Sequence, residues 1–278
     1  MTRARLGFIG AGNMASAILR GVLQKGFLPA SDVLICDVDA AKRDALAARY
    51  GVAVAPDYVS LVRDCAFVVL AVKPNVLGGV LRSVAGEAEG KRLISIAAGW
   101  TFQMLIDALG ADCHAGVLRV MPNTPAMIGE SFIAICEQTT MSPDDLQWCT
   151  LLLSTLGETA VLPERLFDAV IAVSGSSPAY VYMVIEAMAD GAVALGMPRA
   201  LAYRAAAQAV LGSAKMVLET GEHPGKLKDD VCSPGGTTIE AVRALEKGGM
   251  RSAVIEAMLA CARKSKEMSQ PHDDVRKV

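Results

Sequence analysis

Short apolar runs alternate with longer segments of helical periodicity through the first half of the chain. The run at 6–9 is followed by a glycine-containing turn and then by apolar residues at positions 18, 19, 22 and 23, which share one face of a helix. Further short runs lie at 33–36, 67–72, 93–97, 117–120 and 133–136. Because buried parallel strands read as short continuous apolar runs, this alternation predicts a mainly parallel sheet with helices on its faces.

The pattern changes after about Pro163, where no convincing strand follows and stretches rich in alanine, methionine, leucine and valine begin. The first two of these stretches start with a proline, which is favoured at the first turn of a helix. The expected helices lie at 178–195, 198–219, 237–246 and 250–268. The expected domains are an α/β domain at 1–162, an all-helical domain at 163–270 and a frayed polar tail at 271–278.

The turn after the first apolar run has the sequence Gly10-Ala11-Gly12-Asn13-Met14-Ala15. Gly10 permits a tight turn, and Gly12 lets the backbone approach a pyrophosphate held by the N–H groups of Asn13 and Met14 at the helix start. Ala15 replaces the third glycine, which is an accepted variant. A glycine-rich turn also serves packing alone, but its place between a strand and a helix favours a dinucleotide site.

Cofactor choice is expected at the end of the second strand, where Asp37 follows the run 33–36. A carboxylate there accepts a hydrogen bond from the adenosine ribose 2′-hydroxyl, which favours NADH. The alternatives are a solvated loop carboxylate and a 2′-phosphate met by Lys42 and Arg43, so the cofactor is NADPH or NADH. Asp39 is expected to be the N-cap of the next helix.

Two further segments are expected at the carboxyl edge of the sheet, where open α/β folds bind ligands. In Ala71-Val72-Lys73-Pro74, we expect Ala71, Lys73 and Pro74 to lie against the cofactor, with Lys73 reaching phosphate or ribose. The alternative is a solvated lysine before a helix that begins at Pro74. We also expect a cofactor contact at Ala97, the last residue of the run 93–97.

Composition narrows the classes of partner. The chain is 53% hydrophobic, 20% charged and 5% aromatic, which favours a large subunit interface over two ordinary domain cores. The net charge of −2 lacks the basic excess that nucleic-acid binding requires. Seven scattered cysteines without Cys-x-x-Cys spacing and three separated histidines argue against disulfides and a metal site, and favour a reducing cytoplasm.

The N-terminus superficially resembles a signal peptide, because Arg3 and Arg5 precede an apolar stretch ending in Ala-Ser-Ala at 15–17. The glycines of the turn at 10–15 interrupt that stretch, so a strand and a phosphate-binding turn explain it better. No apolar run is expected to approach the roughly 20 residues that span a bilayer. The sequence therefore predicts a soluble cytoplasmic protein with no membrane partner.

The segment 233–238, Ser-Pro-Gly-Gly-Thr-Thr, has the chemistry of a turn that enters a helix. Exposed N–H groups at a helix start, together with the helix dipole, favour a carboxylate. The hydroxyls of Thr237 and Thr238 can donate to a ring nitrogen or an anionic oxygen. Taken alone, the turn is equally well explained as a capped helix.

This turn, with the Leu245-Glu246 that ends its helix, resembles the signature of pyrroline-5-carboxylate reductases. The likeness covers nearly the whole chain, through 10–15 (GAGNMA), 71–74 (AVKP), 95–99 (SIAAG), 119–125 (RVMPNTP) and 174–179 (SGSSPA). The resemblance implies a Rossmann domain followed by a helical dimerisation domain, with interleaved helices in a homodimer and rings of dimers. It also implies hydride transfer from NADPH or NADH to the C=N bond of 1-pyrroline-5-carboxylate, which yields L-proline in the last step of proline biosynthesis.

The resemblance assigns roles to the turn. It implies that the substrate carboxylate lies at Ser233, Gly235, Gly236 and Thr237, and that the catalytic Thr238 hydroxyl points at the imine nitrogen. A cyclic imine is protonated before hydride arrives, so a hydroxyl donor suffices. Asp230 is assigned no role.

Two loops keep alternative interpretations. Asn123 is expected near the nicotinamide as a cofactor contact, or as a structural turn residue. Ser177 is expected to be the N-cap before Pro178, and the upstream residues Ser174 to Ser176 to line the substrate pocket, with Ser176 as a substrate contact. Of these two roles for the segment, capping is favoured. Two rival functions are a β-hydroxyacid dehydrogenase, for which no signature stands out, and a nucleotide sensor, which does not need the turn at 233–238. Imine-dependent NAD(P)H oxidation discriminates between these functions.

Overall fold

The computed structural model describes residues 5–270, so the predicted polar tail at 271–278 lies outside the described residues. The chain divides into two compact units. One contains the residues up to Gly175 and those from Cys261 onward, and the other is Ser176–Ala260. The division falls after the expected boundary at residue 162, because Phe167 and Val170 pack against Ala134 and Cys136 of the sheet.

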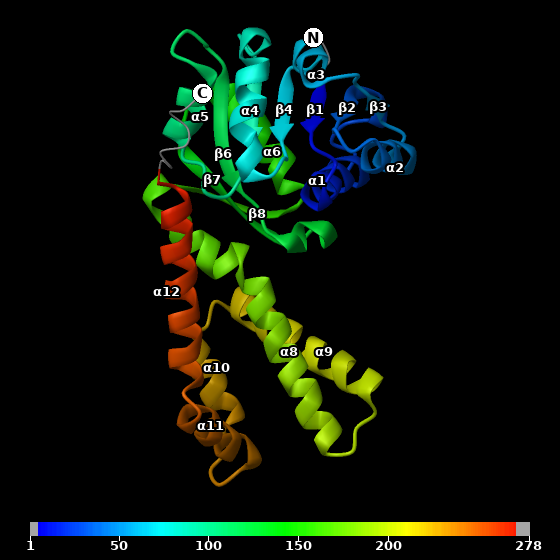
Figure 1. Ribbon diagram of the computed structural model, residues 1–278. Coiled ribbons are helices and arrows are strands. Elements are labelled where there is room, and N and C mark those ends of the chain that lie inside the picture. The colour runs from blue at the N-terminus through cyan, green and yellow to red at the C-terminus, as the bar shows by residue number, and fades with distance from the viewer. Residues whose placement is uncertain (1–4, 271–278) are drawn as a thin grey trace. The chain divides into compact units, whose positions relative to one another are not determined.

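The first unit is built on one eight-stranded sheet of order β3-β2-β1-β4-β5-β6-β7-β8 (Figure 1). Its strands are β1 (Leu6–Ile9), β2 (Val33–Cys36), β3 (Ala53–Val54), β4 (Phe67–Leu70), β5 (Arg92–Ser95), β6 (Gly116–Met121), β7 (Ser131–Thr139) and β8 (Gly157–Leu162). Strands β1 to β6 are parallel, β7 is antiparallel to β6, and β8 is parallel to β7. The order 3-2-1-4-5-6 is that of dinucleotide-binding sheets, which confirms the predicted fold class.

Helices cover both faces of this sheet. They are α1 (Asn13–Gln24), α2 (Ala40–Tyr50), α3 (Tyr58–Asp64), α4 (Pro74–Val84), α5 (Phe102–Leu109) and α6 (Pro143–Ser154). Side chains alternate across a strand, so Phe8 packs with α1 and α6 on one face, and Ile9 packs with α3, α4 and α5 on the other. The two cores hold the carboxyl ends of the strands in one row, where the cofactor residues are expected.

Short helical pieces connect the sheet to the rest of the chain. They are η1 (Ala30–Asp32), η2 (Ala85–Glu87), η3 (Thr124–Ile128), η4 (Glu164–Leu166), α7 (Phe167–Val170) and the π-helical turn η5 (Ile171–Gly175). The Ser265 hydroxyl donates to Asp168 Oδ1 at 2.6 Å, which connects the end of the last helix to α7 within this unit.

The second unit is helical. Its helices are α8 (Ser177–Ala194), α9 (Arg199–Thr220), α10 (Pro224–Val231), α11 (Thr237–Lys247) and α12 (Met250–Met268), of which α12 continues into the first unit. The four predicted helices are confirmed. Helix α10 was not predicted, because its sequence holds a proline, a glycine and only two large apolar residues.

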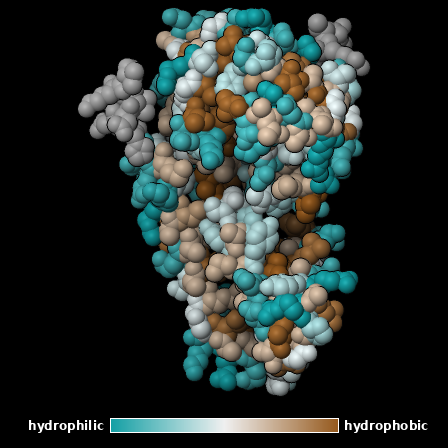
Figure 2. Space-filling model, turned by 45° about the vertical axis from the view of Figure 1, so that its right-hand side comes forward, coloured by the Kyte–Doolittle hydropathy of each residue, from teal (hydrophilic) through white to brown (hydrophobic). Residues whose placement is uncertain are grey.

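This helical unit has a small core of its own. Alanines 189, 202 and 206 are its buried apolar residues, whereas Leu195 is 91%, Leu218 75% and Met183 69% exposed. On the face drawn in Figure 2, apolar residues are interspersed with polar ones. So many exposed apolar side chains on one unit indicate a surface that another chain covers.

One continuous helical stretch, Glu164–Ala194, contains an 18-residue window of mean hydropathy 1.3, with 22% of the window buried. By length and composition alone it could cross a membrane, which differs from the expectation that no segment is this apolar. The polar residues at 174, 176 and 177 interrupt the stretch. An exposed apolar helix is also what a subunit interface requires.

Candidate functional site

The glycine turn lies where β1 and β4 meet, at the point where the strand order reverses. Gly10 has φ 108°, and a Cβ there would lie 2.5 Å from the Ala71 carbonyl oxygen. The N–H of Ala71 donates to the Ile9 carbonyl at 2.8 Å, so the two expected cofactor segments are neighbours. Only glycine fits at position 10, because both its backbone conformation and the adjacent carbonyl exclude a side chain.

Helix α1 begins immediately after this turn with its first N–H groups uncapped. Gly12 is the N-cap residue and supplies no side-chain hydrogen bond, and Asn13 and Met14 are the first helical residues. A Cβ at Gly12 would meet no protein atom within 4 Å. The open space before a helix N-terminus fits the pyrophosphate of NADPH or NADH.

These two glycines make a matched pair of variants. We expect Gly10→Ala to lower the free energy of unfolding, because the new methyl overlaps Ala71. Gly12→Ala is expected to unfold like the wild type but to bind NAD(P)H about tenfold or more weakly, since its methyl meets only the cofactor. Urea unfolding and fluorescence titration measure the two effects. Normal nucleotide affinity of Gly12→Ala would place the pyrophosphate elsewhere.

The Asp37 carboxylate is held by two backbone donors. Its Oδ2 accepts from the Ala11 N–H at 2.6 Å, and its Oδ1 accepts from the Asp39 N–H at 2.8 Å. The carboxylate therefore has a fixed orientation beside the glycine turn. The hydrogen bond between Ala11 and Asp37 connects the end of the second strand to the turn at 10–15. It could not be predicted from the sequence, because the two residues are 26 positions apart.

The cations near Asp37 are paired with other carboxylates. Lys42 Nζ lies 2.8 Å from Asp39 Oδ2, and Arg43 Nε lies 2.8 Å from Asp44 Oδ1. The hydrogen bond to Lys42 lowers the pKa of Asp39, and the same bond raises the pKa of Lys42. Asp39 also accepts from the Lys42 N–H, which confirms it as the N-cap of α2.

The next cofactor segment lies at the start of α4. Lys73 is the exposed N-cap residue and Pro74 is the first helical residue. Trp100 Nε1 donates to the Pro74 carbonyl at 2.9 Å, and the indole lies close to Gly78, where a Cβ would be 3.1 Å from it. Trp100 therefore connects this segment to the loop after β5, a role that the sequence did not reveal.

The loop after β5 forms hydrogen bonds at both of its ends, at Ala97 and at Phe102. Ala97 is buried, and its N–H donates to Ser95 Oγ at 3.4 Å, so a contact of Ala97 with the cofactor stays a prediction. The Phe102 N–H donates to Glu164 Oε1 at 2.6 Å, and Arg119 Nη1 donates to the same oxygen at 2.6 Å. Arg119 belongs to the segment 119–125 singled out above, but its partner lies 45 residues away.

Asn123 lies between β6 and η3 with its side chain buried. Its Nδ2 donates to the Ser174 carbonyl oxygen at 3.1 Å and to Ser174 Oγ at 3.0 Å. Its Oδ1 accepts from Ser131 Oγ at 2.8 Å. These contacts give Asn123 a structural role, but with distant segments and not with its own backbone as a turn residue would have. A contact with the cofactor stays a prediction.

The turn at 233–238 opens α11 in the second unit. The Gly236 N–H donates to the Ser233 carbonyl at 3.0 Å, and Gly235 has φ 67°, a conformation that favours glycine. A side chain at Gly236 would overlap Ser233 Oγ. Gly236 is the N-cap residue and provides no side-chain cap, so the N–H groups of the first turn of α11 remain available to a ligand.

Thr237 and Thr238 are the first two residues of α11, and Thr238 is half-buried. Glu240 lies in the same first turn, where its charge would repel an anion. Arg243 Nε and Nη2 both donate to Glu240 Oε2, at 3.1 and 3.0 Å, and this ion pair offsets the repulsion. The helix start can therefore attract a carboxylate.

One prediction about the segment 174–179 is wrong. Helix α8 begins at Ser177, so Ser176 and not Ser177 occupies the N-cap position, and no side-chain cap is formed there. The reason is that α8 follows the π-helical turn directly, which moves the helix start one residue toward the N-terminus. Ser176 stays a predicted substrate contact.

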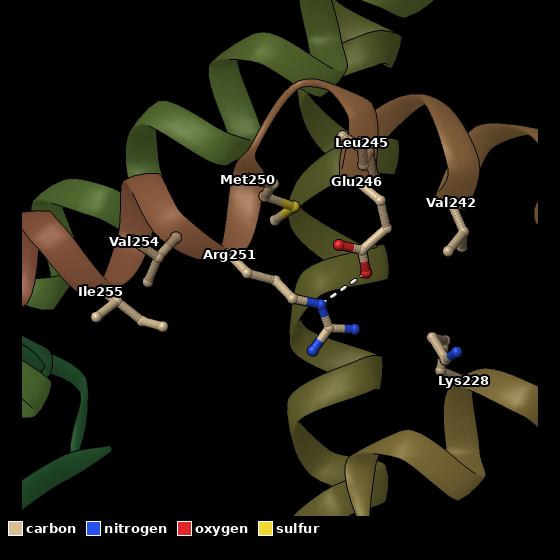
Figure 3. A pocket seen from close by; sticks show the side chains of 8 residues that line it. All are labelled: Lys228, Val242, Leu245, Glu246, Met250, Arg251, Val254 and Ile255. Atoms are coloured by element: carbon tan, nitrogen blue, oxygen red, sulfur yellow. Dashed lines mark hydrogen bonds and ion pairs between the residues drawn. The ribbon is translucent and has the colours of Figure 1, made fainter.

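A groove of about 530 Å³ lies on the second unit between α10, α11 and α12 (Figure 3). It is lined by Lys228, Val242, Leu245, Glu246, Met250, Arg251, Val254 and Ile255. Two of these lining residues form an ion pair, in which Arg251 Nε and Glu246 Oε1 are 2.6 Å apart. None of the predicted site residues lines this groove, and its apolar walls do not match a small charged imino acid.

Buried thiols take no part in this chemistry. Burial raises the pKa of Cys65 to about 11 and that of Cys149 to about 12, so both stay protonated and unreactive at neutral pH. Among residues 5–270, no three His, Cys, Asp or Glu side chains are grouped as a metal site would require.

Two family models match the chain. Residues 164–268 match the model of pyrroline-5-carboxylate reductase dimerisation, and residues 5–99 match that of coenzyme F420-dependent NADP oxidoreductases. The first match covers the helices with exposed apolar side chains, and the second covers the glycine turn, Asp37 and Lys73. The two halves of the chain thus match the two kinds of domain that the resemblance implied.

Relatives match over nearly the full length. The chain is 46% identical to pyrroline-5-carboxylate reductase of Escherichia coli over 96% of this chain and 98% of the relative. It is 45% identical to that of Synechocystis over 96% and 98%. The crystal structure of Plasmodium falciparum pyrroline carboxylate reductase with NADP bound has a TM-score of 0.87 at 29% identity and covers 97% of this chain and 100% of the other. The chain therefore belongs to the pyrroline-5-carboxylate reductase family.

Proposed function

We propose that the turn at 233–238 binds the carboxylate of 1-pyrroline-5-carboxylate and that Thr238 assists reduction of its C=N bond. The protein is an NAD(P)H-dependent reductase that converts this cyclic imine to L-proline, the last step of proline biosynthesis. The observation that carries the residue assignment is the uncapped start of α11, which follows two glycines and presents two threonine hydroxyls.

The chemistry needs little acid–base assistance from the protein. The N–H groups of Thr237 and Thr238, with Ser233, Gly235 and Gly236 shaping the turn, bind the carboxylate and fix the ring. The imine nitrogen carries a proton before hydride arrives, and the Thr238 hydroxyl donates to the lone pair that develops on this nitrogen as the C=N bond is reduced. Ser176 contributes a further polar contact to the substrate. Catalysis then rests on orientation and on polarisation of the imine.

When bound, NADPH or NADH supplies the hydride that the imine carbon accepts. The residues that hold it are those at the carboxyl edge of the sheet. They are Gly10, Gly12, Asn13, Met14, Asp37, Ala71, Lys73, Pro74 and Ala97. The sequence also predicted a cofactor contact for Asn123, whose side-chain nitrogen faces Ser174. Lys73 suits a phosphate, because its side chain is cationic and exposed at the start of α4.

The direct test is the loss of reduced-nicotinamide absorbance with pyrroline-5-carboxylate, with NADH and NADPH in parallel. Oxidation is expected only when the imine is added. Tight nucleotide binding without imine-dependent oxidation would contradict the proposed function and would favour a nucleotide sensor.

We propose further that Asp37 makes NADH the better cofactor. Two backbone N–H groups fix its carboxylate, Lys42 and Arg43 are already paired, and a 2′-phosphate would meet an oriented negative charge. Asp37→Ser is expected to shift the ratio of kcat/KM for NADH over NADPH at least about tenfold toward NADPH. Asp57→Ser is the control, because it removes a nearby carboxylate while serine still caps α3. An unchanged ratio in Asp37→Ser would exclude this role.

Self-association is supported by the dimerisation model and by the exposed apolar helices. We propose an interleaved homodimer in which α8 to α12 of one copy, including the groove of Figure 3, are covered by helices of a second copy. Such dimers can assemble further into rings. Sedimentation velocity tests the assembly. We also place the protein in the cytoplasm, without membrane or nucleic-acid partners, from its scattered cysteines without Cys-x-x-Cys spacing and its net charge of −2.

A further inference from the structure

The residues Asn123, Ser131 and Ser174 form a closed polar network inside the first unit, and all three are buried. The Ser131 hydroxyl donates to Asn123 Oδ1 at 2.8 Å and accepts from the Asn123 N–H at 3.2 Å. The Asn123 amide donates to both the carbonyl oxygen and the hydroxyl of Ser174. The network thus joins the end of β6, the start of β7 and the π-helical turn η5.

The orientation of the Asn123 amide follows from its partners. A carbonyl oxygen only accepts hydrogen bonds, so the NH₂ group must face Ser174. The amide nitrogen then makes two hydrogen bonds within the protein, to the carbonyl oxygen and to the hydroxyl of Ser174. It therefore faces Ser174, although Asn123 lies two residues after the end of β6, at the ligand-binding edge of the sheet.

The turn that Asn123 bonds is of an unusual kind. Ile171–Gly175 is a π-helical turn, and single π turns within helices are rare and concentrate at functional sites. Ser174 Oγ also reaches the Phe132 carbonyl of β7 at 3.5 Å. A Cβ at Gly175 would lie 3.2 Å from Met121 Cε, so the turn packs closely against β6 as well. Its last residue, Gly175, precedes Ser176, the proposed substrate contact.

We propose that Asn123 is a positioning residue for the substrate: through Ser174 it holds the π-helical turn that delivers Ser176. The inference rests on the proposed function, because it assigns Ser176 to the imine-binding site. Buried networks in which every group is satisfied fix one conformation strongly, and among residues 5–270 no buried side-chain nitrogen or oxygen is without a partner. Asn123 therefore affects substrate binding through the π-helical turn, whereas the affinity for NAD(P)H depends on the glycine turn and Asp37.

The test compares Asn123→Asp and Ser174→Ala with the wild type. Asn123→Asp keeps the shape but points a carboxylate at the Ser174 carbonyl, and Ser174→Ala removes only the hydroxyl. Both are expected to raise the KM for the imine about tenfold, as the loss of a buried hydrogen bond does, with NAD(P)H dissociation constants within about twofold of wild type. Weaker NAD(P)H binding with an unchanged imine KM would overturn the proposal and restore Asn123 as a cofactor contact.

Thr140→Val is the matched control. Thr140 lies at the opposite end of β7, where its hydroxyl donates to the Ala115 carbonyl at 2.9 Å and accepts from the Val117 N–H at 2.8 Å. This variant also loses hydrogen bonds between the same strands but is expected to leave the imine KM unchanged. An equal rise in KM for Thr140→Val would reduce the effect of Asn123 to general destabilisation.

Hydrogen exchange gives a readout that does not depend on activity. In Asn123→Asp and in the milder Ser131→Ala, amides of 172–176 are expected to exchange at least about tenfold faster, while those of β1 and α1 keep wild-type rates. Unchanged exchange in the turn would overturn the positioning role even if the enzyme is active. Faster exchange in a protein whose wild type lacks imine-dependent oxidation would instead locate the failure in the proposed function.

Discussion

Thr238→Ala is expected to lower kcat about 100-fold while leaving the dissociation constant for NAD(P)H within about twofold. Thr238 is the second residue of α11, and its backbone N–H remains in the alanine variant. Carboxylate binding at the helix start is therefore kept, and only the hydroxyl that donates to the ring nitrogen is lost. Because this donation strengthens as the nitrogen gains charge density, its loss falls on the transition state more than on substrate binding.

Two variants separate the hydroxyl from the space it fills. Thr238→Val keeps the branched shape and is expected to be as impaired as alanine, whereas Thr238→Ser keeps the hydroxyl and is expected to stay within about tenfold of wild type. Steady-state kinetics with the imine give kcat, and fluorescence titration with NAD(P)H gives the dissociation constant of the cofactor. Wild-type turnover in Thr238→Val would remove Thr238 from the mechanism.

The sheet was predictable where its strands are buried on both sides. All residues of β1, β2 and β4 are buried, so each reads as an uninterrupted apolar run. Strand β3 has only two residues, both exposed, and β8 mixes glycine, glutamate and threonine with apolar residues, so neither left a recognisable pattern. Both were missed because they lie at the two edges of the sheet, where burial no longer dictates the residues.

The local parts of the site were predictable as well, since a turn's backbone conformation selects its residues. Gly10 and Gly235 adopt positive φ angles, and both were identified from neighbouring residues alone. The contacts between distant segments were not predictable. Examples are the hydrogen bonds of Asp37 with Ala11 and of Asn123 with Ser174. They depend on which strand ends the fold brings together, and no short sequence pattern shows which distant residues become neighbours.

The ion pair between Arg119 and Glu164 is the contact between distant segments that has the largest expected effect on stability. The Arg119 side chain is 5% exposed and that of Glu164 is 22% exposed, and the guanidinium also lies 4.3 Å from the centre of the Phe167 ring. A buried cation that loses its carboxylate partner keeps the cost of its desolvation without the compensating attraction. The pair connects β6, η4 and the start of α5, so its loss affects three elements at once.

Glu164→Gln is therefore expected to lower the free energy of unfolding by about 3 kcal/mol, at the lower end for buried pairs because Glu164 retains some contact with solvent. Glutamine still accepts a hydrogen bond from the Phe102 N–H, so the difference in the free energy of unfolding between this variant and the wild type measures the effect of losing the negative charge. Glu87→Gln removes the same charge from the exposed pair with Arg63 and is expected to cost under about 1 kcal/mol. Urea unfolding at one subunit concentration measures both. Equal costs would mean that the Phe167 ring and the surrounding dipoles already stabilise Arg119 without a carboxylate.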